Sequence, residues 1–459
     1  MKTVPPAFKL DTLKRNWIEG ISGLHFWRRV QEYTARIEAI IESANEQGVL
    51  IAEPNPIEFA AAFFASTHMG VPTILANPNW QQSEWEQLGK QVNPAVVFGD
   101  SGISKMQASE TNNPRPGTIL IPTGGSSGRL KLAIHTCETL TAACQGFCSF
   151  IGSETVHSCC MLPLYHVSGL MQLLRSFTSE GKIAFTNLKA FQPGQFSIMD
   201  AEKLCLSLVP TQLQRMLERK VVADWLGHLK AIFLGGAPMM PALQARVREL
   251  HLPVVSTYGM TETAAMVTAL PVDDFLSGNS SVGLPLEHAQ VQIVRKDGSA
   301  CSPKEKGRIH TRARSLCLGY HGSPLDILKD GYLSTDEGYL DRDGYLYVVG
   351  RSDRIIISGG EKIDPLEVET VFLDTGMIAQ VLVIGWPDPE WGERLITFCV
   401  PNSKTSNADI HQRLRANLAN YKIPKQIILL PQLPLTPQGK PDRTLITKLL
   451  KIEHRTSNL

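Results

Sequence analysis

The sequence predicts an α/β protein with a large N-terminal domain of layered α/β subdomains, a β-rich subdomain and a small C-terminal α/β domain. Helix-like and strand-like segments alternate over residues 51–117 and again over 136–256, which is the pattern of layered α/β folds. From residue 280 the chain changes to short strands and turns. After residue 355 a compact module follows in which strands and helices alternate again.

Length and composition restrict the class of protein. The 459 residues are enough for two or three domains with a large core. Apolar residues make up 43% and charged residues 19%, and the formal net charge is +1, so the balance is that of an ordinary globular protein and indicates no polyanionic partner. The first residues lack a secretory pattern, and no run reaches the roughly 18 apolar residues of a membrane span.

The nine cysteines include no Cys-x-x-Cys pair that could bind zinc, and most lie in apolar or helical patterns. We therefore expect a cytoplasmic protein with reduced thiols, no nucleic-acid partner and no membrane span. The sequence leaves the oligomeric state open.

Periodicity and turn residues predict the individual elements. Helices are expected over residues 24–44, 57–66, 84–91, 136–150, 170–179, 211–220, 241–250, 365–373 and 407–420. Strands are expected over residues 72–76, 95–98, 119–121, 130–134, 159–164, 182–185, 204–209, 229–234, 253–256, 289–294, 307–311, 332–333, 380–384, 395–400 and 426–430.

A loop of small residues joins the strands expected at 119–121 and 130–134. Its glycines allow positive φ and a close approach of the backbone to a ligand, and its hydroxyls and cations suit phosphate oxygens: Thr123, Gly124, Gly125, Ser126, Ser127, Gly128, Arg129 and Lys131. A Walker loop would continue from Gly128 with Lys-Ser/Thr into a helix, but Arg129 and a strand-like alternation follow. The alternative is a flexible Gly/Ser linker.

Three further segments carry chemistry. His166 leaves an apolar strand beside Pro and Gly, where a histidine can also be an ordinary loop residue, and Gly235-Gly236 end the strand expected at 229–234. In Tyr258-Gly-Met-Thr-Glu262, the aromatic ring can stack on adenine, the glycine and Thr261 can approach a phosphate, and the glutamate is a hard ligand for Mg²⁺. The alternative is a helix cap at Thr261 and Glu262.

Toward the C-terminus, several charged residues and a glycine pair are further candidates for a site. A carboxylate at Asp336 can accept hydrogen bonds from a vicinal diol, with Arg351 as a nearby cation, although a β-hairpin with surface charges is the simpler interpretation. Gly359-Gly360 would let the backbone pass close to a thin substrate. Lys440 follows a glycine in a proline-rich loop, where most lysines are only solvated.

In this order, over about residues 118–445, the segments resemble the adenylate-forming superfamily of acyl-CoA synthetases, luciferases and peptide-synthetase adenylation domains. Tyr258 to Glu262 matches the superfamily's Tyr-Gly-x-Thr-Glu motif without a gap. The chain departs from the usual pattern at four places, with Gly124 for Ser, Arg129 for Lys, Leu132 for Gly and Thr335 for Gly.

The resemblance implies an enzyme that forms an acyl-adenylate from ATP and an acid, with Mg²⁺, and then transfers the acyl group to CoA. It implies a large domain over residues 1–350, a hinge over 351–354 that pivots on Asp353, and a mobile small domain over 355–459 that carries the catalytic Lys440. The implied ATP-binding residues are Thr123, Gly125, Ser126, Ser127, Gly128, Lys131, Gly235, Gly236, Tyr258, Gly259, Thr261, Asp336 and Arg351. The other implied site residues are His166 and Glu262 for catalysis, Glu262 also for the metal, Ser168 and Gly169 for the acid, and Gly359 and Gly360 for CoA.

Four local stretches resemble the 2-succinylbenzoate–CoA ligases of menaquinone and phylloquinone synthesis: residues 162–170, 234–238, 257–263 and 356–361. Arg175, nine residues after His166, supplies physical support, because a guanidinium can hold the carboxylate of a dianionic acid that does not react. It can equally be a surface residue. The remaining alternatives are a ligase for another aryl or medium-chain acid, and a carrier-loading or non-catalytic relative.

Overall fold

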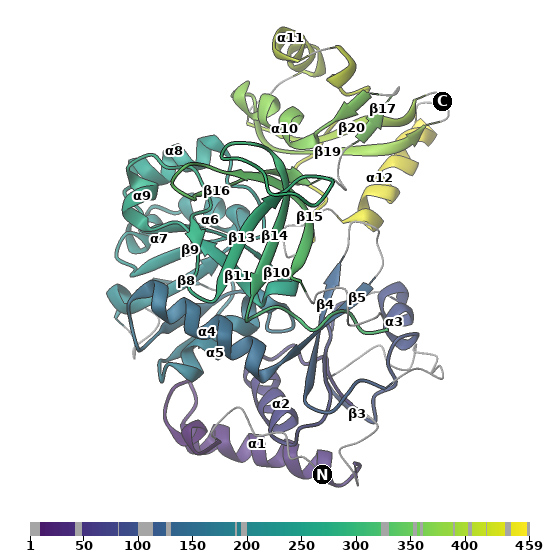
Figure 1. The fold of residues 1–459 in the computed structure, drawn as a ribbon. Helices are drawn as coiled ribbons and strands as arrows, with labels where there is room; N and C mark the ends of the chain where they lie inside the picture. Colours follow the sequence, from purple (N-terminus) through teal and green to yellow (C-terminus); the bar gives the residue numbers. More distant parts are fainter. Residues whose placement is uncertain are drawn as a thin grey trace. The chain divides into compact units, whose positions relative to one another are not determined.

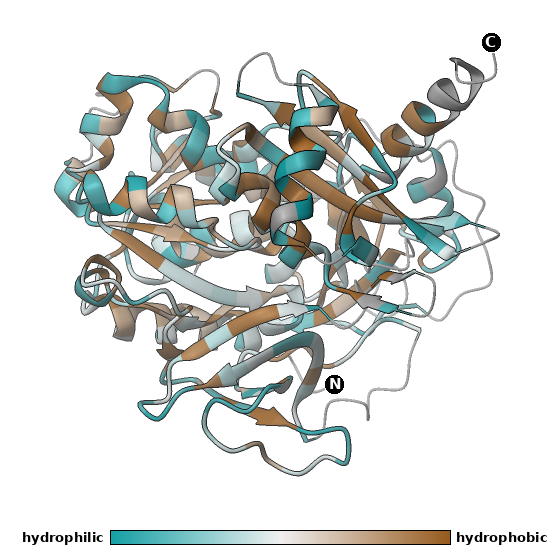
Figure 2. Cartoon of the chain, turned by 90° about the horizontal axis from the view of Figure 1, so that it is seen from above, coloured by the Kyte–Doolittle hydropathy of each residue, from teal (hydrophilic) through white to brown (hydrophobic). Residues whose placement is uncertain are grey.

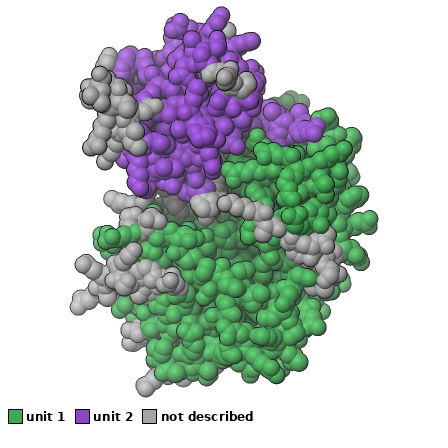
Figure 3. All heavy atoms as spheres, turned by 180° about the vertical axis from the view of Figure 1, so that it is seen from behind, with its two compact units in different colours: residues 1–238, 247–334, 338–347 green, residues 239–246, 335–337, 348–459 purple. Residues whose placement is uncertain are grey.

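The computed structural model describes residues 10–41, 48–80, 82–99, 113–124, 130–188, 191–193, 200–322, 330–351, 356–358, 361–388, 391–402, 406–418, 420–436 and 442–456. The chain divides into two compact units (Figure 3). Unit 1 comprises residues 1–238, 247–334 and 338–347, and unit 2 comprises residues 239–246, 335–337 and 348–459. The expected hinge residue Asp353 lies outside the described residues.

Unit 1 begins with a five-stranded sheet of order β3-β1-β2-β4-β5 (Figure 1). Its strands are β1 Val49–Ile51, β2 Thr73–Leu75, β3 Val96–Phe98, β4 Thr118–Gly124 and β5 Leu130–Thr136. The first four are parallel, and β4 pairs with β5 as an antiparallel hairpin. The helices of this region are α1 Gly23–Glu38, α2 Pro56–His68 and α3 Gln82–Gly89. Ser22 and Asn55 cap the first two through their side chains, and Pro56 occupies the first turn of α2.

A seven-stranded sheet of order β12-β11-β10-β9-β8-β6-β7 follows. Its strands are β6 His157–Cys160, β7 Ile183–Phe185, β8 Leu204–Leu208, β9 Ala231–Leu234, β10 Val254–Met260, β11 Ala265–Ala269 and β12 Leu284–Pro285. The pairs from β7 to β10 are parallel, and β10, β11 and β12 are antiparallel. The helices are α4 Cys137–Ile151, α5 Val167–Thr178, α6 Pro210–Leu217, α7 Lys220–Leu226, α8 Pro241–Glu249 and α9 Val272–Leu276.

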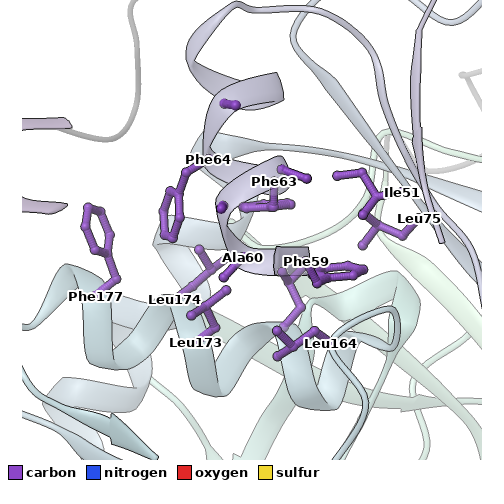
Figure 4. Close-up of a cluster of buried hydrophobic side chains, with 14 of the residues drawn as sticks. Ile51, Phe59, Ala60, Phe63, Phe64, Leu75, Leu164, Leu173, Leu174 and Phe177 are labelled. Atoms are coloured by element: carbon purple, nitrogen blue, oxygen red, sulfur yellow. The ribbon is translucent and has the colours of Figure 1, made fainter. Parts of the chain in front are cut away.

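The core of unit 1 is built on α2, α4 and α5. Phe59, Phe63 and Phe64 of α2 are at most 1% exposed. Figure 4 shows Phe64 on the side of Leu174 and Phe177 of α5, and Phe63 on the side of Ile51 of β1. Because α2 is buried on most of its surface, its residues 59–65 are uniformly apolar. In the hydropathy colouring of Figure 2, hydrophobic residues gather on strands and inner helix faces, whereas the outer helix turns are hydrophilic.

The β-rich region forms a four-stranded sheet of order β13-β14-β15-β16, with β13 Ala289–Val294, β14 Gly307–Ala313, β15 Tyr332–Leu340 and β16 Leu346–Arg351. The C-terminal sheet has the order β18-β17-β20-β19, and β21 pairs with β20. Its elements are β17 Ile356–Ser358, β18 Glu361–Ile363, α10 Pro365–Asp374, β19 Ile378–Asp388, β20 Gly392–Pro401, α11 Asn407–Asn417, β21 Gln426–Leu429 and α12 Arg443–Thr456.

The order of elements confirms the predicted α/β class, and several predicted ends are wrong. The helix expected over 24–44 ends at Glu38, and the strand expected over 159–164 ends at Cys160, because the chain turns before Pro163. The helix expected over 211–220 ends at Leu217, and a second helix begins at Lys220, because the backbone of Arg219 between them is extended. The guanidinium of Arg219 donates to the carbonyl of Phe191. None of the described helices is both long and apolar enough to cross a bilayer.

Candidate active site

The small-residue segment is flanked by the two strands of the β4–β5 hairpin. In the register of this hairpin, Thr123 faces Lys131, and Gly124 faces Leu130. The strands on both sides confirm that the segment is a hairpin and not a Walker-type entry into a helix. Residues 125–129 themselves, which include Gly125, Ser126, Ser127 and Gly128, lie outside the described residues.

Leu132, one of the departures from the superfamily pattern, has a structural explanation. Its side chain is fully buried and packs in a cluster with Leu120 of β4, Trp85 and Leu88. The side chain therefore contributes to the core beneath the hairpin, where a glycine would leave a cavity.

Glu262 lies in a single 3-10 turn, η4 Thr261–Thr263, between β10 and β11. Its carboxylate is buried at 7% exposure, and the hydroxyl of Tyr320 donates to its Oε1 at 2.5 Å. The hydroxyl of Tyr332 lies 3.3 Å from that of Tyr320. Burial and the carboxylate of Glu262 raise the pKa of Tyr320, so its hydroxyl stays protonated and available as a donor.

Tyr320 also joins the Glu262 turn to the hairpin. The ammonium group of Lys131 lies 4.9 Å from the centre of the Tyr320 ring, a cation–π contact. Residues 318–321 run along β5 and exchange backbone hydrogen bonds with Leu132 and Ile134. Lys131 and Glu262, two residues that the sequence singled out from segments far apart, therefore contact the same phenol, one at its ring and one at its hydroxyl.

His135 makes a second link between these segments. It is fully buried on β5; its Nε2 lies 2.8 Å from the carbonyl of Thr261, and its Nδ1 lies 3.0 Å from the hydroxyl of Thr139. Because a carbonyl can only accept, Nε2 carries the proton. Burial lowers the pKa of His135 to about 4, so the ring is neutral near pH 7. It thus fixes the turn that carries Glu262.

Tyr258 and Gly259 lie on β10, because this strand runs on to Met260 where the sequence predicted an end at 256. The ring of Tyr258 is 9% exposed, and its hydroxyl donates to Ser334 at 3.4 Å. A Cβ on Gly259 would come within 1.9 Å of the carbonyl oxygen of Ala265. The glycine is therefore required by the close packing of β10 against β11.

Gly235 and Gly236 follow β9, as predicted. A Cβ on Gly235 would lie 2.7 Å from the hydroxyl of Thr257, and Gly236 has φ +79, a left-handed conformation that favours glycine. Close packing therefore requires glycine at position 235, and the backbone conformation favours it at position 236. Both positions lie at the carboxyl end of a parallel strand, where α/β sheets bind ligands.

His166 is the N-cap residue of α5, and its ring packs 4.8 Å from that of Tyr165. Ser168 is exposed in the first turn of the helix, and Gly169 is buried. A Cβ on Gly169 would come within 2.2 Å of the carbonyl oxygen of Pro163, so the glycine lets the helix start close to the preceding turn.

Arg175 lies two turns further along α5 and is only 4% exposed, which excludes the surface alternative. Its guanidinium stacks 4.1 Å from the ring centre of Phe147 on α4. The titratable groups nearest to it are the thiols of Cys144, Cys148 and Cys205. Burial lowers the pKa of Arg175. Nε has no hydrogen-bond partner, and no carboxylate among the described residues pairs with this cation.

In unit 2, Asp336 and Arg351 lie together as the sequence suggested. Arg351 Nε is 3.6 Å from Asp336 Oδ1, and its Nη2 donates to the hydroxyl of Thr335 at 2.7 Å. Thr335, a further departure from the superfamily pattern, therefore supplies an acceptor that orients the arginine beside the aspartate.

The expected hinge Asp353, the CoA residues Gly359 and Gly360 and the catalytic Lys440 lie outside the described residues. Within the described part of the chain, no three His, Cys, Asp or Glu side chains group as a metal site. Glu262 alone still suits Mg²⁺, which is commonly held by one or two carboxylates and substrate phosphates. All nine cysteines are free thiols.

Sequence reasoning missed Tyr320 and His135. Tyr320 hydrogen-bonds to Glu262, 58 residues away, and His135 hydrogen-bonds to Thr261, 126 residues away. Tyr320 follows Gly319 in a loop with no pattern of its own, and His135 falls within an alternating strand. A histidine on the apolar face of a strand was the one available signal.

Comparisons with known proteins identify the family of this chain. The chain matches the AMP-binding enzyme family over residues 105–321 and the AMP-binding enzyme C-terminal domain over residues 367–440. A 2-succinylbenzoate–CoA ligase of Enterococcus faecalis is 31% identical over 375 residues, covering 81% of this chain and 77% of that protein. A ligase of the same name from Bacillus cereus is 29% identical over 433 residues, covering 89% and 88%.

Solved structures show the same fold. The o-succinylbenzoate CoA synthetase of Bacillus subtilis, in complex with its acyl-adenylate intermediate, has a TM-score of 0.78 at 25% identity and coverage of 93% of both chains. ATP-bound MatB of Rhodopseudomonas palustris has a TM-score of 0.80 at 21% identity, with coverage of 96% of this chain and 97% of that one. From its sequence matches, the chain belongs to the AMP-binding, or adenylate-forming, enzyme family.

Proposed function

We propose that this chain is an AMP-forming acid–CoA ligase that activates 2-succinylbenzoate with ATP and transfers the acyl group to CoA. The relatives named above carry this activity in their names. The observation on this chain that supports the substrate is the buried guanidinium of Arg175. The enzyme would then act in the cytoplasm, in quinone synthesis.

Energetics favour an anionic ligand for Arg175. Burial of an ion without a counter-ion destabilises the protein by several kcal/mol. A desolvated cation–π contact such as that with Phe147 offsets only about 2 kcal/mol of this. Apolar surroundings and three thiols offer no other compensation. A substrate carboxylate would remove the deficit by pairing with the guanidinium, and a fatty acid would not.

The position of Arg175 on α5 also suits a diacid. Nine residues separate it from His166, which corresponds to about 13 Å of helix rise. An acid that lies along α5 could place its reacting carboxylate toward His166 and its second carboxylate toward Arg175.

In the first half-reaction, an oxygen of the acid attacks the α-phosphorus of ATP, and the bond to the bridging oxygen breaks to release pyrophosphate. Charge grows on the bridging and leaving oxygens, so donors and cations there lower the barrier. We assign Thr123, Lys131 and the hydroxyls of Ser126 and Ser127 to the β- and γ-phosphates, and Lys440 to the carboxylate and α-phosphate. Thr261 would contact the α-phosphate, and Glu262 would hold Mg²⁺, which neutralises phosphate charge.

Adenosine would be bound by Tyr258, Gly235 and Gly236 at the base and by Asp336, oriented by Arg351, at the ribose. In the second half-reaction the CoA thiolate attacks the acyl carbonyl and AMP leaves. The proposed pivot at Asp353 separates a large domain ending near 350 from a small domain starting near 355. Rotation there would withdraw Lys440 and bring in Gly359 and Gly360 beside the thiol.

The test is a panel of acids assayed by direct detection of the CoA thioester. We expect a higher kcat/KM for 2-succinylbenzoate than for 4-oxo-4-phenylbutanoate, which lacks the ring carboxylate, or for a medium-chain fatty acid. Arg175→Met should raise KM for 2-succinylbenzoate by about 10-fold or more, since a hydrogen-bonded charge is lost, and leave the monocarboxylate unaffected. Preference for fatty acids, an unchanged KM, or transfer only to a carrier protein would refute the assignment.

A further inference from the structure

His288 is a buried polar residue that none of the predicted roles uses. It lies between β12 and β13 and is 3% exposed, and neither Nδ1 nor Nε2 has a hydrogen-bond partner. A buried imidazole normally satisfies at least one nitrogen. A buried polar group without a hydrogen bond destabilises the fold, so two on one ring call for an explanation.

The ring of His288 lies directly against α4. A Cβ on Gly146 would come within 1.9 Å of its Nδ1, so the glycine leaves room for the imidazole. Gly146 precedes Phe147, and the guanidinium of Arg175 stacks on the ring of Phe147. His288 and Arg175, which come from different elements, therefore contact consecutive residues of α4, Gly146 and Phe147.

The charge state of His288 follows from these surroundings. Burial, with Arg314 and Arg175 as nearby cations, lowers the pKa of His288 to about 4. The ring is therefore neutral near pH 7 and has one N–H donor and one acceptor. The adjacent carboxylate of Glu287 is exposed and does not hydrogen-bond to it.

We propose that His288 donates an N–H hydrogen bond to the second carboxylate of the acid substrate, beside Arg175, so that the two side chains form one anion site. This inference rests on the proposed function and extends it to a further specificity residue. It gives a partner to Nε of Arg175 and to the protonated nitrogen of His288, two buried donors that have none among the described residues. An acid with one carboxylate would leave both unsatisfied.

The experiment compares the wild type with His288→Phe, which keeps a planar ring beside Gly146 and removes both nitrogens. We expect KM for 2-succinylbenzoate to rise about 10- to 100-fold, because a hydrogen bond to a charged group is lost. KM for 4-oxo-4-phenylbutanoate, and kcat for both acids, should stay within about 2-fold. Calorimetric binding of 2-succinylbenzoate without ATP should weaken by the same factor as KM rises.

A parallel loss with both acids, or no loss with either, would overturn the inference. His288→Leu gives a second measurement if His288→Phe does not fold, as judged by the melting temperature. Failure of the proposed function is distinguishable, because wild type would then show no preference for the dicarboxylate. If the preference exists and depends on Arg175 but survives in both His288 variants, only the inference about His288 is wrong.

Discussion

Replacement of Tyr320 separates two contacts that this side chain makes. Tyr320→Phe removes the hydroxyl that donates to Glu262 at 2.5 Å and keeps the ring 4.9 Å from the ammonium group of Lys131. Tyr320→Leu removes both. The two variants therefore report separately on the proposed metal ligand and the proposed phosphate-binding lysine.

The magnitudes follow from the two contacts. A partner that orients a metal ligand is worth about 10- to 100-fold in metal affinity, so Tyr320→Phe should raise the Mg²⁺ concentration for half-maximal pyrophosphate release at least about 10-fold. Its KM for the acid should not change. Tyr320→Leu also loses a cation–π contact of about 0.5–1 kcal/mol at an exposed lysine, so ATP should bind a further 2- to 5-fold more weakly.

The assay is a magnesium titration of pyrophosphate release, with equilibrium binding of an ATP analogue as a readout independent of turnover. Tyr332→Phe is the matched control, because its hydroxyl lies 3.3 Å from that of Tyr320 and no hydrogen bond links it to Glu262. An unchanged or lower magnesium requirement in Tyr320→Phe would refute the reasoning, since the hydroxyl would then compete with the metal.

Three other predictions concern different parts of the chain. Lys440→Ala should slow adenylation by on the order of 100-fold or more, as loss of a transition-state donor does, but retain thiol transfer from a supplied acyl-adenylate; equal loss in both steps would count against the assignment. Burial holds the pKa of His135 at about 4, below its unfolded value of 6.5. The unfolded state therefore binds the proton first as pH falls, and the free energy of unfolding drops by about 2.4 kcal/mol between pH 7 and pH 4.5. Denaturant unfolding should show a smaller pH dependence in His135→Gln, and an identical slope would contradict this. Leu132→Ala should lower the free energy of unfolding by about 3 kcal/mol through a cavity beneath the hairpin, and a loss below about 1 kcal/mol would show that the site collapses.

Features fixed by local chemistry were predictable from the sequence. Thr136 caps α4 with its side chain, and Asp364 caps α10 before Pro365. The alternation after the glycine loop correctly indicated a second strand rather than a helix. In each case the deciding residues are neighbours in the chain, so a window of a few residues contains the cause.

Features that depend on distant partners were not predictable. β10 extends through Tyr258 to Met260 because β11 pairs with it, and no residue in the strand itself signals that partner. The fold of α4 and α5 buries Arg175, which from its spacing alone could have been exposed. The burial of His288 could not be predicted either, because it depends on packing against Gly146, 142 positions earlier in the chain.

The two-step reaction is tested most directly by mass spectrometry of single-turnover mixtures with 2-succinylbenzoate, ATP and Mg²⁺, before and after CoA is added. We expect succinylbenzoyl-adenylate and pyrophosphate to accumulate in equal amounts without CoA, and the adenylate to convert to the CoA thioester and AMP once CoA is present. Formation of ADP, or a thioester without a prior adenylate, would contradict the two-step reaction.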